Sequence, residues 1–238
     1  MHKNSYVFIF AAVVTITCSI LLAAAANLLR DRQQENIALD IQKNILKSAE
    51  LTSPEMTRQE ILSRYDKYIH SEVINLKGEK VPDKTVEEID PKKDLDLLPV
   101  YYAEDNGQIL AYIIPISGKG LWSTIYGYLA LEKDLNTIEG ITFYKHGETP
   151  GLGGEIEKEW FTNNFKGKKI YSPDGNLVSI TVVKGKVHNL IPDAEAYHYV
   201  DGISGSTLTG KGLTNFLKKD LETYKPFFEK ERNEHTEQ

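Results

Sequence analysis

Hydroxyl side chains and glycines alternate from Asp201 to Gly210 (DGISGSTLTG), directly before a predicted helix. The unpaired amides of a first helical turn carry partial positive charge, and a glycine turn before them can enclose an anion such as a phosphate. An N-cap alone accounts for any one of these hydroxyls, but it explains less readily four hydroxyls around two glycines. The segment therefore predicts an anion-binding loop with Thr207 at its centre.

Two further glycine-rich loops come earlier in the chain. The loop Gly147–Glu155 (GETPGLGGE) opens a predicted helix, so a ligand could approach its backbone closely and meet free N–H donors. From the residues alone, ligand contact and a plain turn are equally open for this loop. The loop Pro115–Ser123 lacks the spacing of a phosphate-binding P-loop. It is interpreted as a wide connection, in which the Trp122 indole is the single hint of ligand stacking.

Hydrolase and metal chemistry fit these residues poorly. The segment Gly202–Ser206 approaches a G-x-S-x-G nucleophile elbow, but its fifth position is Ser206 and no long parallel-strand pattern precedes it. The tripeptide HGE at 146–148 offers no helical i, i+4 ligand pair, and no third ligand can be named. The single cysteine, Cys18, excludes an internal disulfide, a multi-cysteine zinc site and an iron–sulfur cluster. We predict neither a catalytic residue nor a metal ligand, so any electron carrier must be organic.

Length and charge narrow the classes of protein. With 238 residues, 41% hydrophobic and 26% charged, the chain fits one large or two small globular domains, and not a disordered or multi-spanning membrane protein. The 28 basic and 34 acidic side chains give a net charge of −6. This is the wrong sign for binding nucleic-acid phosphates by bulk charge, so no nucleic-acid partner is expected.

The N-terminal segment is the longest apolar stretch. Residues 6–29 carry no charge, and as a helix they would span about 36 Å, enough for a hydrocarbon core of roughly 30 Å. A cleaved signal peptide is the alternative, because Ala23–Ala26 resemble a cleavage site, but the stretch is longer than a usual signal core. We predict a short tail at 1–5 and a transmembrane helix at 6–29. Lys3 before the span and two arginines after it lean only weakly toward a cytoplasmic domain.

Residues 30–97 are predicted to form a helical lead-in and a charged connection. Ile37, Ile41 and Ile45 have the i, i+4, i+8 spacing of an amphipathic helix over 31–50. We expect this helix to continue out of the membrane and to pack on the main domain.

A second helix and a strand should follow. Thr52 and Glu55 have capping-box spacing, and Pro54 suits a first helical turn. The helix is expected to end before a strand around Val73, Ile74 and Leu76. The stretch 78–97 is charged and has no apolar period, which indicates a surface connection.

From Leu98 onward the sequence consists of strand-like runs rich in Tyr, Ile, Val and Leu. The runs VYYAED and QILAYIIPI flank an Asn-Gly pair at 106–107, the strongest short hairpin signal. STIYGYLALE and TIEGITFYKH are the next predicted strands. A short helix near 155–164 follows, and an Asp-Gly turn at 174–175 is expected to lead into a strand, LVSITVVKG.

The last helix is predicted from about Leu208 to Tyr224, with four apolar side chains on one face: Leu213, Phe216, Leu217 and Leu221. Residues 229–238 are charged and are expected to be a solvated tail. The predicted fold is α+β: an N-terminal transmembrane helix followed by one mixed domain at 98–228, with a largely antiparallel sheet and flanking helices.

Four segments carry a family resemblance. The anchor followed by RQQENIALDIQKNIL, and the later GKGLWSTIYGYLAL, ITFYKHGETPGLGGEI and VDGISGSTLTGKGL, resemble the C subunit of the Na⁺-translocating NADH:quinone reductase over nearly the whole chain. The resemblance implies a membrane-anchored electron-transfer subunit with no catalytic site of its own, whose FMN-binding domain is 98–228. In this family and in the related G subunit of the Rnf complex, a Ser/Thr-Gly-Ala-Thr segment carries FMN through a phosphoester on its last threonine. That position is Thr207 here, and Ser206 stands where the family usually has alanine.

The same resemblance implies roles for neighbouring residues. A separate flavin transferase is expected to recognise Asp201, Gly202, Ser204, Gly205 and Thr207. The phosphate should lie against the amides at the helix start, and the isoalloxazine against the loop Gly147–Glu155. The residues expected to bind the covalent FMN are Thr149, Gly151, Leu152, Gly153, Ser204, Gly205, Ser206, Leu208 and Thr209. Because a serine side chain is small, we expect Thr207 to be modified even though Ser206 stands where the family usually has alanine.

Location and partners also follow from the resemblance. The family's flavin transferase works outside the cytoplasm, so the domain is expected on the outer, periplasmic face of the bacterial inner membrane, and this outweighs the weak charge count. The expected partners are the other subunits of the sodium pump, the flavin transferase during maturation, and the membrane. Two alternatives stay open. One is the Rnf G subunit, which the long region before Leu98 disfavours, and the other is an anchored module that binds a ligand without redox work.

Overall fold

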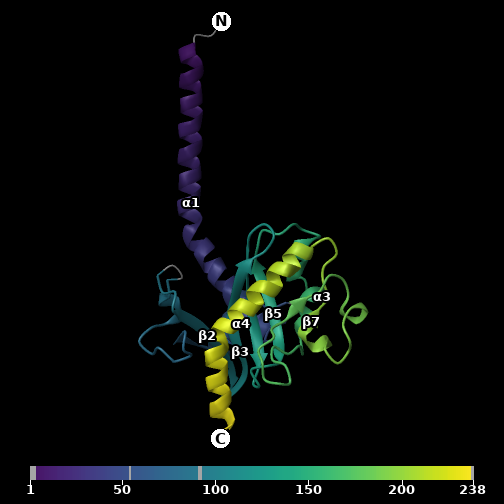
Figure 1. The fold of residues 1–238 in the computed structure, drawn as a ribbon. Helices are drawn as coiled ribbons and strands as arrows, with labels where there is room; N and C mark the ends of the chain where they lie inside the picture. The colour runs from purple at the N-terminus through teal and green to yellow at the C-terminus, as the bar shows by residue number, and fades with distance from the viewer. Residues whose placement is uncertain (1–3, 54, 91–92, 237–238) are drawn as a thin grey trace. The chain divides into compact units, whose positions relative to one another are not determined.

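The computed structural model describes residues 4–53, 55–90 and 93–236. The chain divides into two compact units, one up to Asp40 and the other from Ile41 onward. Helix α1 (Asn4–Ser48) contributes to both units. The second unit holds the sheet and the other helices (Figure 1).

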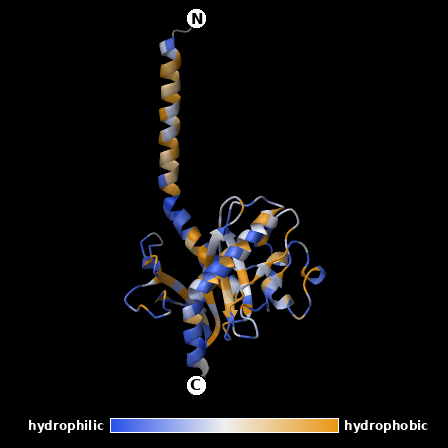
Figure 2. Ribbon diagram, viewed as in Figure 1, coloured by the Kyte–Doolittle hydropathy of each residue, from blue (hydrophilic) through white to orange (hydrophobic). Residues whose placement is uncertain are grey.

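In the first unit, α1 carries the apolar stretch predicted from the sequence. Figure 2 shows this stretch as an orange segment followed by a hydrophilic one. Its large side chains are exposed, with Phe8 at 74% and Leu28 at 80%. By length and composition, α1 is the one helix among the described residues that could cross a membrane. The predicted helix at 31–50 is its continuation, but of the three isoleucines Ile37 is exposed and only Ile45 is fully buried.

The second unit is built on a five-stranded antiparallel sheet in the order β1-β2-β3-β4-β5. Its strands are β1 (Ile69–Asn75), β2 (Leu97–Asp105), β3 (Gln108–Lys119), β4 (Thr124–Glu132) and β5 (Ile138–Lys145). Each strand pairs with its neighbour in sequence, so the sheet is a meander. The strands predicted in the meander are confirmed. The turn at Asn106 and Gly107 has positive φ at both residues, as an Asn-Gly hairpin requires.

Helices cover both faces of this sheet. On one face, α4 (Thr207–Thr236) lies across β3 and its neighbours (Figure 1). Its apolar side chains pack on the sheet, and the rings of Tyr102 and Tyr112 lie against Phe227. On the other face lie the end of α1, where Asn44 O accepts a hydrogen bond from the Thr142 hydroxyl, and helix α2 (Arg58–Tyr68). The α+β fold with a largely antiparallel sheet is confirmed.

One local prediction is wrong: the position of the capping box at the start of the second helix. Helix α2 begins at Arg58, because Thr57 and Glu60 form the capping box that we assigned to Thr52 and Glu55. The expected place of Pro54 in a first turn lies outside the described residues. The surface connection at 78–97 is largely irregular, with one 3-10 turn at 86–88.

The segment after the meander also differs from its prediction. The single helix expected near 155–164 is three short pieces: 3-10 turns at 153–157 and 163–165 flanking α3 (Glu159–Thr162). The expected strand LVSITVVKG is reduced to β6 (Thr181–Val182), which pairs in parallel with β7 (Tyr199–Val200). Two more 3-10 turns, 187–189 and 196–198, complete this region.

Helix α4 runs twelve residues beyond its expected end at Tyr224. Pro226 lies inside it, where a proline removes one hydrogen bond and opposes the helix by about 3 kcal/mol. The helix nevertheless continues, because Phe227 and Phe228 after the proline are buried in the core. Residues up to Thr236 that we expected to form a solvated tail are therefore helical.

Candidate functional site

Thr207 is the first residue of α4 and its side chain is exposed. Gly205 before it has φ +76°, and the Ser206 N–H donates to Ile203 O at 3.0 Å, which closes a tight turn. The first intrahelical bond runs from Gly210 N–H to Ser206 O. The amides of the first turn therefore point out of the helix without intrahelical partners, as an anion site at Thr207 needs.

Ser206 occupies the N-cap position but does not cap the helix. Its side chain is 4% exposed, and its Oγ has no hydrogen-bond partner among the described residues. A buried hydroxyl without a partner is unfavourable by about 1–3 kcal/mol. This donor is thus available to a ligand at the helix start.

In chain order, the first (Pro115–Ser123), second (Gly147–Glu155) and third (Asp201–Gly210) glycine-rich loops meet at one buried carboxylate, Glu148, which is 5% exposed. Its Oε2 accepts a hydrogen bond of 2.6 Å from the Thr209 hydroxyl in the third loop. Its Oε1 accepts a hydrogen bond of 2.9 Å from the backbone N–H of Trp122 in the first loop. Glu148 therefore fixes the start of α4 against both other loops.

Glycines make this convergence possible. A Cβ on Gly120 or on Gly153 would lie 2.6 or 2.7 Å from a carboxylate oxygen of Glu148. A Cβ on Gly205 would lie 2.9 Å from Leu152 Cδ2. The last distance shows that the second and third loops lie against each other.

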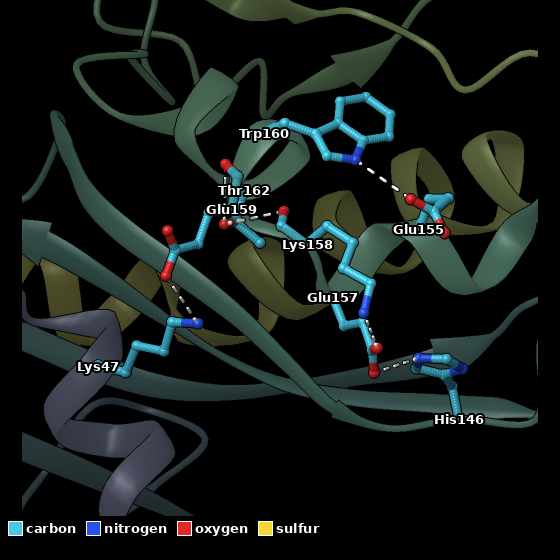
Figure 3. A network of polar contacts seen from close by, with 8 residues as sticks. All are labelled: Lys47, His146, Glu155, Glu157, Lys158, Glu159, Trp160 and Thr162. Carbon is cyan, nitrogen blue, oxygen red and sulfur yellow. Dashed lines mark hydrogen bonds and ion pairs between the residues drawn. The ribbon is translucent and has the colours of Figure 1, made fainter. Parts of the chain in front are cut away.

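A polar network holds the segment that follows the second loop (Figure 3). His146 Nε2 lies 3.5 Å from Glu157 Oε2, and Lys158 Nζ lies 2.9 Å from the other oxygen of Glu157. The Trp160 indole donates to Glu155 at 3.2 Å. The ends of β5 and of the second loop are thereby tied to the short helices next to them.

Asp201 and Gly202 make structural contacts. Asp201 accepts hydrogen bonds from Lys186 Nζ at 2.9 Å and from the Val187 N–H at 2.8 Å. Partial burial acts to raise the pKa of Asp201, but these two hydrogen bonds outweigh it and leave the pKa below its ordinary value. A Cβ on Gly202 would lie 2.0 Å from Val183 O. These two residues hold the third loop against the segment around 183–187.

The predicted cofactor residues divide by exposure. The exposed ones are Thr149, Gly151, Leu152, Ser204, Gly205, Thr207 and Leu208. Gly153, Ser206 and Thr209 are buried. Because the Thr209 hydroxyl is hydrogen-bonded to Glu148, Thr209 can offer a ligand only its backbone amide.

The residues present fit a phosphorylated ring compound such as FMN. First-turn amides and the unpartnered Ser206 hydroxyl suit a phosphate. Leu152 is 43% exposed and Leu208 60% exposed, so both present apolar surface next to Thr207 on which a flat ring can lie.

Sequence reasoning missed Glu148 and Ser123. Glu148 was considered only as part of a loop and of the tripeptide HGE at 146–148, and its bonded partners are far away in sequence. Ser123 Oγ accepts the Gly147 N–H at 2.6 Å and joins the first and second loops. The sequence signal for Glu148 was that it is a carboxylate in a glycine-rich loop that contains no basic residue to pair with it.

Comparisons with known proteins show which sequences and structures this chain is similar to. The family model described as FMN-binding domain matches residues 120–222. The C subunit of the Na⁺-translocating NADH-quinone reductase of Pseudomonas aeruginosa is 38% identical, over 91% of this chain and 90% of that protein. The C subunit of the same enzyme from Vibrio alginolyticus is 33% identical, over 84% and 83%. The crystal structure of the C subunit from Parabacteroides distasonis superposes with a TM-score of 0.73 at 36% identity, covering 84% of this chain and 96% of that one.

Proposed function

The chain belongs to the family formed by the C subunits of the Na⁺-translocating NADH-quinone reductase, and on this premise we propose that it carries FMN covalently on Thr207 and relays electrons within that complex. A bound FMN would supply the redox chemistry, accepting and passing on electrons. The observation that supports Thr207 most directly is its place as the exposed first residue of α4, beside unpaired amides and the buried Ser206 hydroxyl.

The chain's own residues hold and orient the cofactor. First-turn amides bind the phosphate, while Leu152 and Leu208 provide an apolar surface for the ring. Glu148 keeps the loops in register through its bonds to Thr209 and Trp122. A tethered cofactor cannot leave between turnovers, which suits a relay.

Attachment requires an outside enzyme. A threonine hydroxyl is a weak nucleophile, and no base is hydrogen-bonded to Thr207 among the described residues. A flavin transferase would supply a flavin nucleotide activated as a phosphoanhydride. The Thr207 oxygen would lose its proton and bond to phosphorus, while the other half of the anhydride leaves. Asp201, Gly202, Ser204, Gly205 and Thr207 form the recognition segment in this proposal.

The apolar part of α1 anchors the chain in the bacterial inner membrane, with the domain on the periplasmic side. Length and exposed apolar surface support the anchor. Orientation can be tested by adding protease to right-side-out vesicles, where the domain should be cleaved. Protection of the domain would refute the periplasmic side. The other subunits of the complex are the expected partners.

Covalent flavin is tested with the full chain co-expressed with a flavin transferase. The denatured wild-type band should fluoresce under ultraviolet light, and Thr207→Ala should be dark. Thr223→Ala, which removes a threonine hydroxyl bonded to Lys219 O on the same helix, is the matched control and should fluoresce like wild type.

Two results would count against the proposal. Fluorescence retained in Thr207→Ala would exclude that residue as the attachment site. A dark wild type would favour the alternative of an anchored module that binds a ligand without redox work. The intact mass of the native protein gives the same answer independently, as an added flavin phosphate or an unmodified chain.

A further inference from the structure

A cavity of about 310 Å³ opens beside Thr207, between the start of α4 and strand β6. Thr207, Ser206 and Gly210 line it on one side, and Thr181 and Val182 on the other. The cavity is formed within the second unit and lies at the end of a 30-residue helix.

The charged side chains that line this cavity are both positive. Lys184 and Lys211 both line it, and neither forms an ion pair with a carboxylate in the described part of the chain. Its lining contains no Asp or Glu. The N-terminal end of α4 adds partial positive charge at the same place. An anion would therefore be attracted from three directions.

Ser206 gives an independent indication of a ligand. Ser206 lines this cavity, and its hydroxyl is buried with no hydrogen-bond partner among the described residues. The hydroxyl of a threonine nearby is used: Thr214 Oγ1 donates to Gly210 O and accepts the Val182 N–H. Of the buried side-chain polar atoms of the residues that line the cavity, Ser206 Oγ is the one without a partner in the described part of the chain.

We propose that this cavity is a phosphate site, in which Lys184, Lys211 and the Ser206 hydroxyl bind the phosphate of the cofactor carried by Thr207. The inference rests on the proposed function and adds the side chains that neutralise the anion. Esterified to Thr207, the phosphate is a diester with one negative charge. Two ammonium groups and the first-turn amides offset that charge, and the serine hydroxyl gains the partner that it lacks.

The first test uses the unmodified full-length chain, produced without a flavin transferase and kept in detergent. It is melted in inorganic phosphate and in chloride at equal ionic strength, because binding to the folded state raises Tm. The wild type should gain Tm in phosphate. The double variant Lys184→Gln/Lys211→Gln should lose this increment, and Ser206→Ala should have a smaller one.

Lys218→Gln is the matched control, because Lys218 lies two turns beyond Lys211 on α4 and pairs with Glu222. It should keep the full increment. Phosphate also stabilises proteins by exclusion from their surface, so only the difference between wild type and the double variant is informative. Equal increments in the two proteins would overturn the phosphate site.

The second test repeats the melt with the flavinylated chain. If the phosphodiester on Thr207 occupies the cavity, added phosphate should raise Tm no more than in the double variant. A full increment would mean that the diester lies elsewhere and would overturn the assignment. A chain that binds phosphate but never acquires flavin would contradict the proposed function while supporting the cavity as an anion site.

Discussion

Glu148 is the single residue on which the register of the three loops depends most directly. Its buried carboxylate oxygens accept hydrogen bonds from the Thr209 hydroxyl and from the backbone N–H of Trp122. Glu148→Ala would leave both donors unpaired, and we expect it to lower the free energy of unfolding by about 3 kcal/mol. Glu148→Gln should cost only about 1 kcal/mol, because its carbonyl can accept from Trp122 and the Thr209 hydroxyl can turn to accept from its amide.

Urea unfolding of the full-length chain, followed by tryptophan fluorescence, measures these losses. Glu222→Ala is the control, since it removes an exposed carboxylate whose ion pair with Lys218 spans 3.9 Å, and it should change stability by less than about 1 kcal/mol. A loss for Glu148→Ala no larger than that of the control would contradict the bridging role.

The site was predictable where a residue's role is local. The glycines and hydroxyls before a helix predicted the exposed helix start at Thr207. Glu148 was not predictable, because its partners Trp122 and Thr209 lie 26 and 61 residues away. Such contacts depend on how the sheet and α4 pack.

Among the elements, α4 depends on a close approach at the turn after β1. Gly78 has φ +73°, and a Cβ there would lie 2.5 Å from the backbone nitrogen of Phe227. Gly175 has φ +78° with nothing within 4 Å of such a Cβ. The positive φ alone should lower the free energy of unfolding by about 1 kcal/mol in each Gly→Ala variant. In Gly78→Ala the total loss should reach about 3 kcal/mol, because the α4 backbone must also shift. Thermal unfolding of the two variants side by side tests this, and equal losses would show that α4 does not pack there.

The same helix shows why some elements escaped prediction. The hairpin at 106–107 is set by the two residues of its turn, so a local pattern was sufficient. Past Pro226 the local rule ends a helix, but burial of Phe227 and Phe228 against the sheet overrides it. In LVSITVVKG the residues have strand propensity, yet only Thr181 and Val182 find a partner strand. Propensity without a pairing edge does not make a sheet.

For the whole molecule, stability should depend on pH through Asp220, which joins α4 to the sheet. Its carboxylate accepts the Ser117 N–H at 2.7 Å, and burial raises its pKa to about 6, although that hydrogen bond and Lys219 act in the opposite direction. The folded state therefore holds this proton more tightly than the unfolded state, whose pKa is near 3.8. Between about pH 4 and pH 6 the unfolded state binds fewer protons, so this group's contribution to stability falls as pH rises, by up to about 3 kcal/mol.

Asp220→Asn should remove this loss, because an amide carries no charge and its oxygen can still accept the Ser117 N–H. We expect the variant to equal the wild type near pH 4 and to exceed it by as much as about 3 kcal/mol at pH 8. Urea unfolding at closely spaced pH values gives the two curves, and Asp96→Asn, at an exposed position, should follow the wild type. Parallel curves for Asp220→Asn and wild type would mean that this carboxyl ionises alike in both states, and that burial under α4 does not hold its proton.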